Sequence, residues 1–198
     1  MSALFGILSG LMGLLIYALY YRQVRRGAST PNLTTWFIWV LVCWLNLATY
    51  VELARNDLFK GSMAVVSAGC MTLLFATFVR GGRFTRFGLT DMLILILALA
   101  VMVFWQISDN AVWANLALQV CFVLSFIPTL RGLIHDQARE APMPWLLGVV
   151  TYLLNITAIA LGTDPRPAEF AFPVINGVLG NGSVLVVTLA FRRYASWL

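Results

Sequence analysis

The sequence predicts an all-α membrane protein of seven transmembrane helices, arranged as two parallel three-helix repeats joined by a linker helix. Three observations predict this fold. Of the 198 residues, 11% are charged and 61% are hydrophobic, with a mean hydropathy of +0.86, whereas about a quarter of a soluble domain is charged. The charges lie between apolar runs long enough to cross about 30 Å of hydrocarbon. The third observation is an internal repeat.

Seven apolar runs are separated by short connections that contain turn-forming or charged residues. We expect each run to form a helix, because a helix satisfies its own backbone hydrogen bonds in lipid. Connections of about 4 to 14 residues leave no room for a soluble domain. The predicted spans are residues 4–21, 34–53, 61–79, 90–106, 111–130, 144–161 and 170–191.

The basic residues predict the orientation of the chain. Ten arginines lie on the side of the first, third and fifth connections and of the C-terminus, against three basic residues on the other side. Positively charged loops stay in the cytoplasm, so we expect the N-terminus outside and the C-terminus in the cytoplasm. The ten are Arg22, Arg25, Arg26, Arg80, Arg83, Arg86, Arg131, Arg139, Arg192 and Arg193; the three are Arg55, Lys60 and Arg166. The net charge of +5 is thereby explained, and no nucleic-acid partner is expected.

A shift of 109 positions superposes the first three spans on the last three without a gap. Trp36 falls on Trp145 and Asn46 on Asn155, and an arginine precedes the tryptophan by 14 positions in both halves. Chance alignments of apolar helices match Leu and Val, but not Trp, Asn and Arg in order. Parallel repeats recur in transporters, with the solute site between the halves. The predicted units are residues 1–86 and 109–198, joined by the linker helix at 87–108.

Two stretches resemble the SWEET and PQ-loop superfamily of seven-helix membrane proteins. Leu124-Ser-Phe-Ile-Pro-Thr-Leu-Arg131 looks like the proline motif of that family, and Pro173-Val-Ile-Asn-Gly-Val-Leu-Gly180 is similar to the pattern of its last helix. The resemblance implies a bidirectional carrier whose two units rock around a central site. It also implies that Asn176, and Ser67 at the equivalent position of the first repeat, lie in the pocket.

Polar side chains within the spans are the candidate solute-binding residues. At about 1.5 Å per residue from the span ends, five of them come out at one level near the middle of the membrane. They are Asn46, Ser67, Gln119, Asn155 and Asn176, with Asn181 deeper. Such side chains either line a cavity that binds a neutral polar solute or join helices by hydrogen bonds without a ligand.

Aromatic residues and one proline complete the candidate site. Trp44 and Tyr152 lie within one turn of Asn46 and Asn155 and are placed to stack on a ring-shaped solute, with core packing as the alternative. Pro128 removes a backbone hydrogen bond inside the fifth span, which makes it a candidate hinge or a static bend. Three further tryptophans at the cytoplasmic starts of spans are assigned to the aromatic belt at the membrane surface. These are Trp36, Trp39 and Trp145.

Missing residue types argue against several functions. The only lysine, Lys60, stands at the outer end of a span, where it cannot hold retinal inside the bundle. The only histidine, His135, lies in a loop, so we expect no metal and no cofactor. Acidic residues lie at span ends or in loops, so we expect neither an enzyme nor a proton carrier at mid-membrane.

The sequence therefore favours a carrier for a small neutral polar solute, such as a sugar or a similar metabolite, in the lipid bilayer. Two alternatives stay open. An amino-acid or vitamin carrier would need a charged partner in the cavity, and a receptor or scaffold would bind without transport. Short loops and a nearly lysine-free, arginine-rich composition point to a bacterial plasma membrane. A homo-oligomer is left open.

Overall fold

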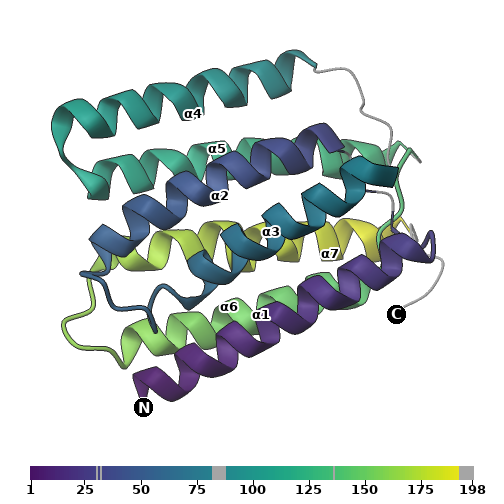
Figure 1. Cartoon of the computed structure of the whole chain (residues 1–198). Coiled ribbons are helices and arrows are strands. Elements are labelled where there is room, and N and C mark those ends of the chain that lie inside the picture. Colours follow the sequence, from purple (N-terminus) through teal and green to yellow (C-terminus); the bar gives the residue numbers. More distant parts are fainter. Residues whose placement is uncertain (30, 32, 82–87, 136, 192–198) are drawn as a thin grey trace.

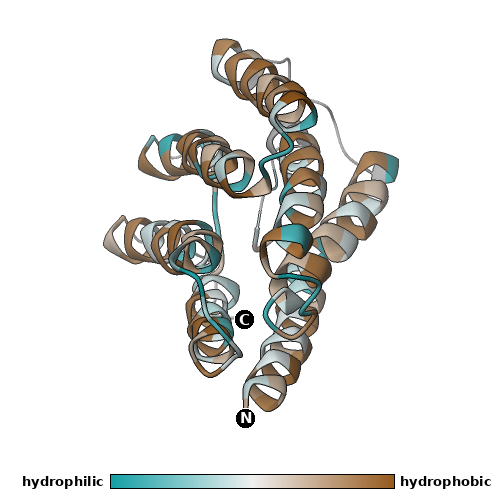
Figure 2. Ribbon diagram, turned by 90° about the vertical axis from the view of Figure 1, so that its left-hand side faces the viewer, coloured by the Kyte–Doolittle hydropathy of each residue, from teal (hydrophilic) through white to brown (hydrophobic). Residues whose placement is uncertain are grey.

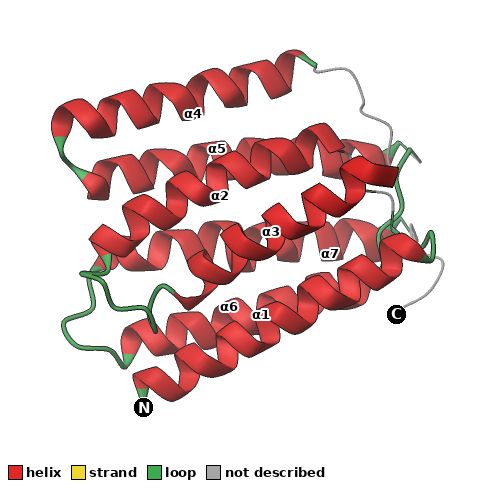
Figure 3. Ribbon diagram, in the orientation of Figure 1, coloured by secondary structure: helices red, strands yellow, loops and turns green. Residues whose placement is uncertain are grey.

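The structure, a computed structural model, describes residues 1–29, 31, 33–81, 88–135 and 137–191. This part of the chain is almost entirely helical and contains no strand (Figure 3). Each predicted span coincides with a helix or, for the last span, with a series of helical segments. The helices are α1 (Ser2–Arg25), α2 (Leu33–Leu53), α3 (Ser62–Gly81), α4 (Leu89–Ser108), α5 (Ala111–Ile134), α6 (Pro142–Ala160) and α7 (Asn181–Ala190), with the short η1 (Pro167–Phe170) and η2 (Pro173–Gly180) before α7.

The described helices have the length and composition of membrane spans. Six of them are long and apolar enough to cross a membrane, the sixth running through η1, η2 and α7 as Pro167–Ala190. The helix α4 adds a shorter apolar stretch, Met92–Ser108. Figure 2 shows hydrophobic residues along the helices and hydrophilic ones gathered at their ends and connections. A multi-pass helical membrane protein is the conclusion that these features support.

Successive helices run in alternating directions, so α7 ends on the side of the bundle opposite to the N-terminus (Figure 1). We call the side that holds Met1 the N-terminal end and the other side the arginine-rich end. The arginine-rich end holds Arg22, Arg25, Arg26, Arg80, Arg131 and Arg139, whereas Arg55, Lys60 and Arg166 lie at the N-terminal end. The other four arginines of the orientation argument, Arg83, Arg86, Arg192 and Arg193, lie outside the described residues.

The helices before and after α4 form two sets of three, α1–α3 and α5–α7, which we call the two three-helix groups. In the first group α3 contacts α1 and α2, and in the second α7 contacts α5 and α6. The groups meet through α1 with α6 and through α2 with α5, while α4 lies at the edge of the bundle against α5 and α2 (Figure 1). Exchanging α1 with α5, α2 with α6 and α3 with α7 converts each of these six contacts between the groups' helices into another of the six.

The last span is less regular than predicted. A π-helical segment, η2, starts at Pro173, whose nitrogen has no hydrogen to donate, and continues directly into α7. The side-chain amide of Asn181 donates to the backbone oxygens of Asn176 and Gly177, at 3.1 and 2.9 Å, and so satisfies carbonyls in this wider turn. A Cβ on Gly177 would come within 2.1 Å of the Tyr152 ring, so the close approach of this segment to α6 requires glycine.

Candidate functional site

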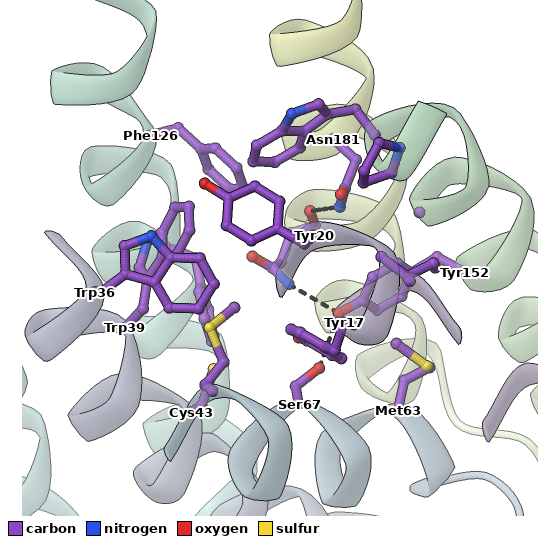
Figure 4. Close-up of a pocket in the computed structure, with 17 residues that line it drawn as sticks. Tyr17, Tyr20, Trp36, Trp39, Cys43, Met63, Ser67, Phe126, Tyr152 and Asn181 are labelled. Atoms are coloured by element: carbon purple, nitrogen blue, oxygen red, sulfur yellow. Dashed lines mark hydrogen bonds between the residues drawn. The ribbon is translucent and has the colours of Figure 1, made fainter. Parts of the chain in front are cut away.

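A cavity of about 70 Å³ lies inside the bundle, between the two three-helix groups (Figure 4). This volume is well above the space that one water molecule requires. Among the described residues, side chains from α1, α2, α3, α5, α6, η2 and α7 line the cavity, and α4 contributes none. Eight of the 17 lining residues are aromatic and none carries a formal charge.

Five aromatic rings form a continuous collar around the part of the cavity toward the arginine-rich end. Neighbouring ring centroids lie 6.3 Å apart for Trp145 and Tyr20, 5.2 Å for Tyr20 and Trp36, 5.6 Å for Trp36 and Trp39, and 5.5 Å for Trp39 and Phe126. All five residues line the cavity and are buried. We refer to them as the aromatic collar.

The assignment of Trp36, Trp39 and Trp145 to the membrane surface is therefore wrong. Their level along the bundle agrees with the prediction, but their side chains turn inward instead of toward lipid. Position in the sequence gives the depth of a residue in a span, whereas the direction of its side chain depends on which helices pack against that face. The shared repeat position of Trp36 and Trp145 was a signal that both face the same interior surface.

Four predicted site residues come together on the cavity wall (Figure 4). Asn176 donates its amide to the Tyr152 hydroxyl at 3.1 Å, and that hydroxyl lies 3.4 Å from the hydroxyl of Ser67. Asn181 lies one turn beyond Asn176, with its amide oxygen against Gly148, where a Cβ would come within 2.4 Å of that oxygen. These residues, Ser67, Tyr152, Asn176 and Asn181, form a single polar patch in an otherwise largely aromatic cavity.

Three other predicted residues, Asn46, Gln119 and Asn155, are buried but do not line the cavity. Asn46 accepts a hydrogen bond from Asn115 at 3.1 Å, and Gln119 donates to the backbone oxygen of Asn115 at 2.9 Å. Asn155 donates to the backbone oxygen of Lys60 at 3.0 Å. Asn46 and Asn155 thus join neighbouring segments, which is the alternative that the sequence left open, whereas Gln119 bonds within its own helix α5. Of the five polar side chains predicted to lie in one layer, Ser67 and Asn176 line the cavity and the other three do not.

The sequence analysis did not single out Asn115, which is fully buried and connects α5 with α2. Its position one helical turn before Gln119 places both side chains on one face of α5, and that spacing was an available signal. Trp44 lies outside the site: it is 50% exposed and donates to the Thr72 hydroxyl at 2.9 Å on the surface of the bundle. Pro128 lies inside α5 as expected, two residues beyond Phe126, and its role as a hinge stays a prediction.

A buried ion pair closes the N-terminal end of the bundle. The ammonium of Lys60 lies 3.0 Å from a carboxylate oxygen of Glu169, with side chains only 4% and 1% exposed. The Tyr50 hydroxyl donates to the backbone oxygen of Glu169 at 2.8 Å. Phe172 packs on the rings of Tyr50, Phe122 and Tyr152 and separates this pair from the cavity.

A second buried carboxylate, Glu140, lies at the arginine-rich end, in the connection before α6. Its two oxygens accept hydrogen bonds from the Tyr20 hydroxyl at 3.1 Å and from the Trp145 indole at 3.3 Å. The Ser29 hydroxyl also bonds to it. Burial raises the pKa of Glu140 to about 7, although these three hydrogen bonds act in the opposite direction.

Glu140 lies in a connection and Glu169 at the start of the last span, as the sequence analysis expected of acidic residues, but their burial was not foreseen. Acidic residues in loops are normally solvated, and nothing in the local sequence marks these two as exceptions. Each becomes buried only because residues from the other three-helix group cover it: Tyr20 covers Glu140, and Lys60 covers Glu169.

Comparison of the chain with protein-family models, with curated proteins and with solved structures finds no match. The resemblance to the SWEET and PQ-loop superfamily therefore stays a prediction from the sequence.

Proposed function

We propose that this protein is a carrier that moves a small solute across the membrane by alternating access, as members of the SWEET and PQ-loop superfamily do. The observation that carries the proposal is the cavity inside the bundle, with its polar patch of Ser67, Tyr152, Asn176 and Asn181. Polar side chains at this depth usually face a solute path.

The arrangement of the cavity wall supports two units that act as a symmetric pair. Ten of the 17 lining residues form five pairs whose members are 109 positions apart, the offset of the sequence repeat. The pairs are Tyr17 and Phe126, Trp36 and Trp145, Trp39 and Gly148, Cys43 and Tyr152, and Ser67 and Asn176. Equivalent positions of two repeats surround a common space when a two-fold axis passes through it.

Both ion pairs of the described residues also join positions 109 apart, Arg55 with Asp164 and Lys60 with Glu169. A residue meets its own equivalent only near a two-fold axis, so these pairs support an axis that passes between them at the N-terminal end of the bundle. Opposite charges at equivalent positions attract, whereas two identical units would bring like charges together. The pairs therefore hold two non-identical units in contact.

A buried contact at each end of the bundle crosses the boundary between the units. Lys60 in the first unit binds Glu169 in the second, and Tyr20 in the first binds Glu140 in the second. A rocking motion of the two units would thus separate the contact at one end while preserving the contact at the other. That is the requirement for alternating access in a carrier built from parallel repeats.

The composition of the wall favours a solute with a flat or ring-shaped apolar part. Aromatic rings provide most of the contact surface, and the polar patch offers few hydrogen bonds for the many hydroxyl groups of a sugar. Among the solutes considered from the sequence, a ring-containing metabolite fits this wall better than a sugar. The alternative of an amino acid or vitamin now has a buried ionisable group, Glu140, close to the cavity.

Thermal unfolding of the detergent-purified protein tests the proposal, with nucleosides, vitamins, amino acids and neutral sugars as ligands. A solute present at 100 times its dissociation constant should stabilise the protein by about 2.7 kcal/mol. Asn176→Ala should abolish this stabilisation. Asn155→Ala, which removes a buried amide outside the cavity, should lower the melting temperature of the free protein but keep the ligand-induced rise.

Uptake of the same solute into liposomes then separates transport from binding. If a solute binds but does not cross the liposome membrane, the receptor alternative replaces the carrier. If no class of solute raises the melting temperature, the small-solute function is wrong.

A further inference from the structure

The aromatic collar and the buried carboxylate Glu140 are parts of one structure. Tyr20 and Trp145 belong to the collar, and each directs its hydrogen-bond donor away from the cavity to a different oxygen of Glu140. The carboxylate thus lies directly behind two of the rings that line the cavity. The third donor, Ser29, is also uncharged, so all the groups seen to bind Glu140 are neutral.

Rings in this arrangement favour a positive charge in the cavity. The faces of Tyr and Trp attract cations, and the attraction is larger when the cation is removed from water. A hydrogen bond from the ring to a carboxylate polarises the ring and increases the negative charge on its face. The collar supplies five rings, three of them from tryptophan, the side chain that binds cations best.

We propose that the cavity binds a small organic monocation, such as a quaternary ammonium group, within the aromatic collar, and that Glu140 provides the compensating negative charge. This inference rests on the proposed function, because it names the class of solute that the carrier would take. A cation without hydrogen-bond donors also suits a wall in which only one patch is polar.

Binding of the cation releases a proton from the carboxyl group of Glu140. In the empty cavity burial keeps Glu140 largely protonated up to about pH 7. A cation nearby stabilises the carboxylate, so binding releases the proton from the carboxyl group to water. The net charge of the site is unchanged by this exchange, which avoids the cost of an uncompensated charge inside the membrane.

The other charged groups described at this end of the bundle do not compensate the negative charge of Glu140. Tyr20 is the titratable group in direct contact with Glu140. The remaining charged or titratable residues of the same end whose side chains the structure describes are exposed to solvent, where salt screens their charge. They are Tyr21, Arg22, Arg25, Arg26, Arg80, Arg131, His135 and Arg139.

Calorimetric titration of the detergent-purified protein with choline, and with its neutral isostere 3,3-dimethylbutan-1-ol, tests the proposal. The two probes have the same shape and differ in charge, so choline should bind at least tenfold more tightly. Because only the ionised form of Glu140 compensates the charge, choline should bind about tenfold more weakly at pH 6 than at pH 8. Binding at pH 6 should also release a proton, measured from the dependence of the heat on the buffer.

Glu140→Gln keeps a side chain of the same size but removes the charge. It should weaken choline binding at least tenfold, abolish its pH dependence and leave the binding of 3,3-dimethylbutan-1-ol unchanged. Glu52→Gln removes an exposed carboxylate from the other end of the bundle and should leave the affinity for choline unchanged. Unchanged binding of the alcohol by Glu140→Gln also demonstrates that this variant is folded.

Two outcomes would overturn the inference. If the neutral alcohol binds as tightly as choline, the collar recognises shape and not charge; if Glu140→Gln binds choline as the unmodified protein does, the carboxylate has no part in binding. A neutral nucleoside such as uridine, titrated in parallel, separates this inference from the carrier proposal. Binding of uridine but not choline contradicts only the cation, whereas the absence of binding by every probe contradicts both.

Discussion

Two buried carboxylates lie at the two ends of the bundle, and their partners differ. Glu169, at the N-terminal end, is paired with the ammonium of Lys60, whereas Glu140, at the arginine-rich end, is held by neutral donors. The charges of the first arrangement balance without a ligand. In the second arrangement, no described partner balances a negative charge on Glu140, so the charge is removed only by protonation or balanced by a bound cation. Equal burial thus gives one acid a structural role, whereas the role that we propose for the other is to bind a cation.

The largest expected effect comes from breaking the complete pair. Lys60→Met leaves Glu169 buried without its cation and should lower the free energy of unfolding by about 3–5 kcal/mol. The double variant Lys60→Met, Glu169→Leu should lose less, because no uncompensated charge remains. Unfolding by dodecyl sulfate in mixed micelles measures both.

The exposed pair at the same end provides the control for this prediction. Arg55 and Asp164 are 3.0 Å apart, but their side chains are 60% and 66% exposed, so Arg55→Ala should cost at most about 1 kcal/mol. If Lys60→Met and Arg55→Ala lose the same stability, the buried pair does not hold the N-terminal end closed.

The second prediction concerns the dependence of stability on pH at the arginine-rich end. The pKa of Glu140 is raised from 4.5 in the unfolded chain to about 7 in the folded protein. Its contribution to stability is therefore fully present below about pH 4.5 and is lost as the pH rises to about 7. At about 1.36 kcal/mol per pH unit, the loss amounts to about 3 kcal/mol.

Glu140→Gln should remove this dependence, so the difference in unfolding free energy between the two proteins should change by about 3 kcal/mol between pH 4.5 and pH 7.5. Measuring the difference cancels the titration of the other acidic residues. A difference that stays constant over this range would mean that Glu140 is ionised in the folded protein without a ligand.

The smallest effect is expected between the two ends, where η2 approaches α6. Gly177→Ala would force a Cβ to within 2.1 Å of the Tyr152 ring, and overpacking of this kind costs about 1–3 kcal/mol. Gly182→Ala is the matched control, because its Cβ would meet only Val149, at 3.9 Å. It should be neutral or stabilising by up to about 1 kcal/mol, since alanine favours a helix. Equal stability of the two variants would contradict the close approach of η2 and α6.

The sequence predicted four residues of the cavity wall, but it did not distinguish them from three buried residues that lie outside the cavity. Ser67, Tyr152, Asn176 and Asn181 were expected on the cavity wall and lie there together. Asn46, Gln119 and Asn155 have a similar depth yet lie away from the cavity, Asn46 and Asn155 bonded to other segments and Gln119 to its own helix. Depth follows from counting residues along a helix, whereas direction around the helix depends on how the helices are rotated against one another.

The sequence by itself determined the number, direction and approximate ends of the helices, because length and hydropathy are properties of each segment taken alone. It also indicated the offset of 109 positions that recurs in the cavity pairs and in both ion pairs. Only the tertiary structure decided which tryptophans face inward and which acids are buried. Those properties arise from contacts between different helices, such as Trp39 with Phe126, and between residues far apart in the sequence, such as Tyr20 with Glu140 and Lys60 with Glu169, which no local pattern records.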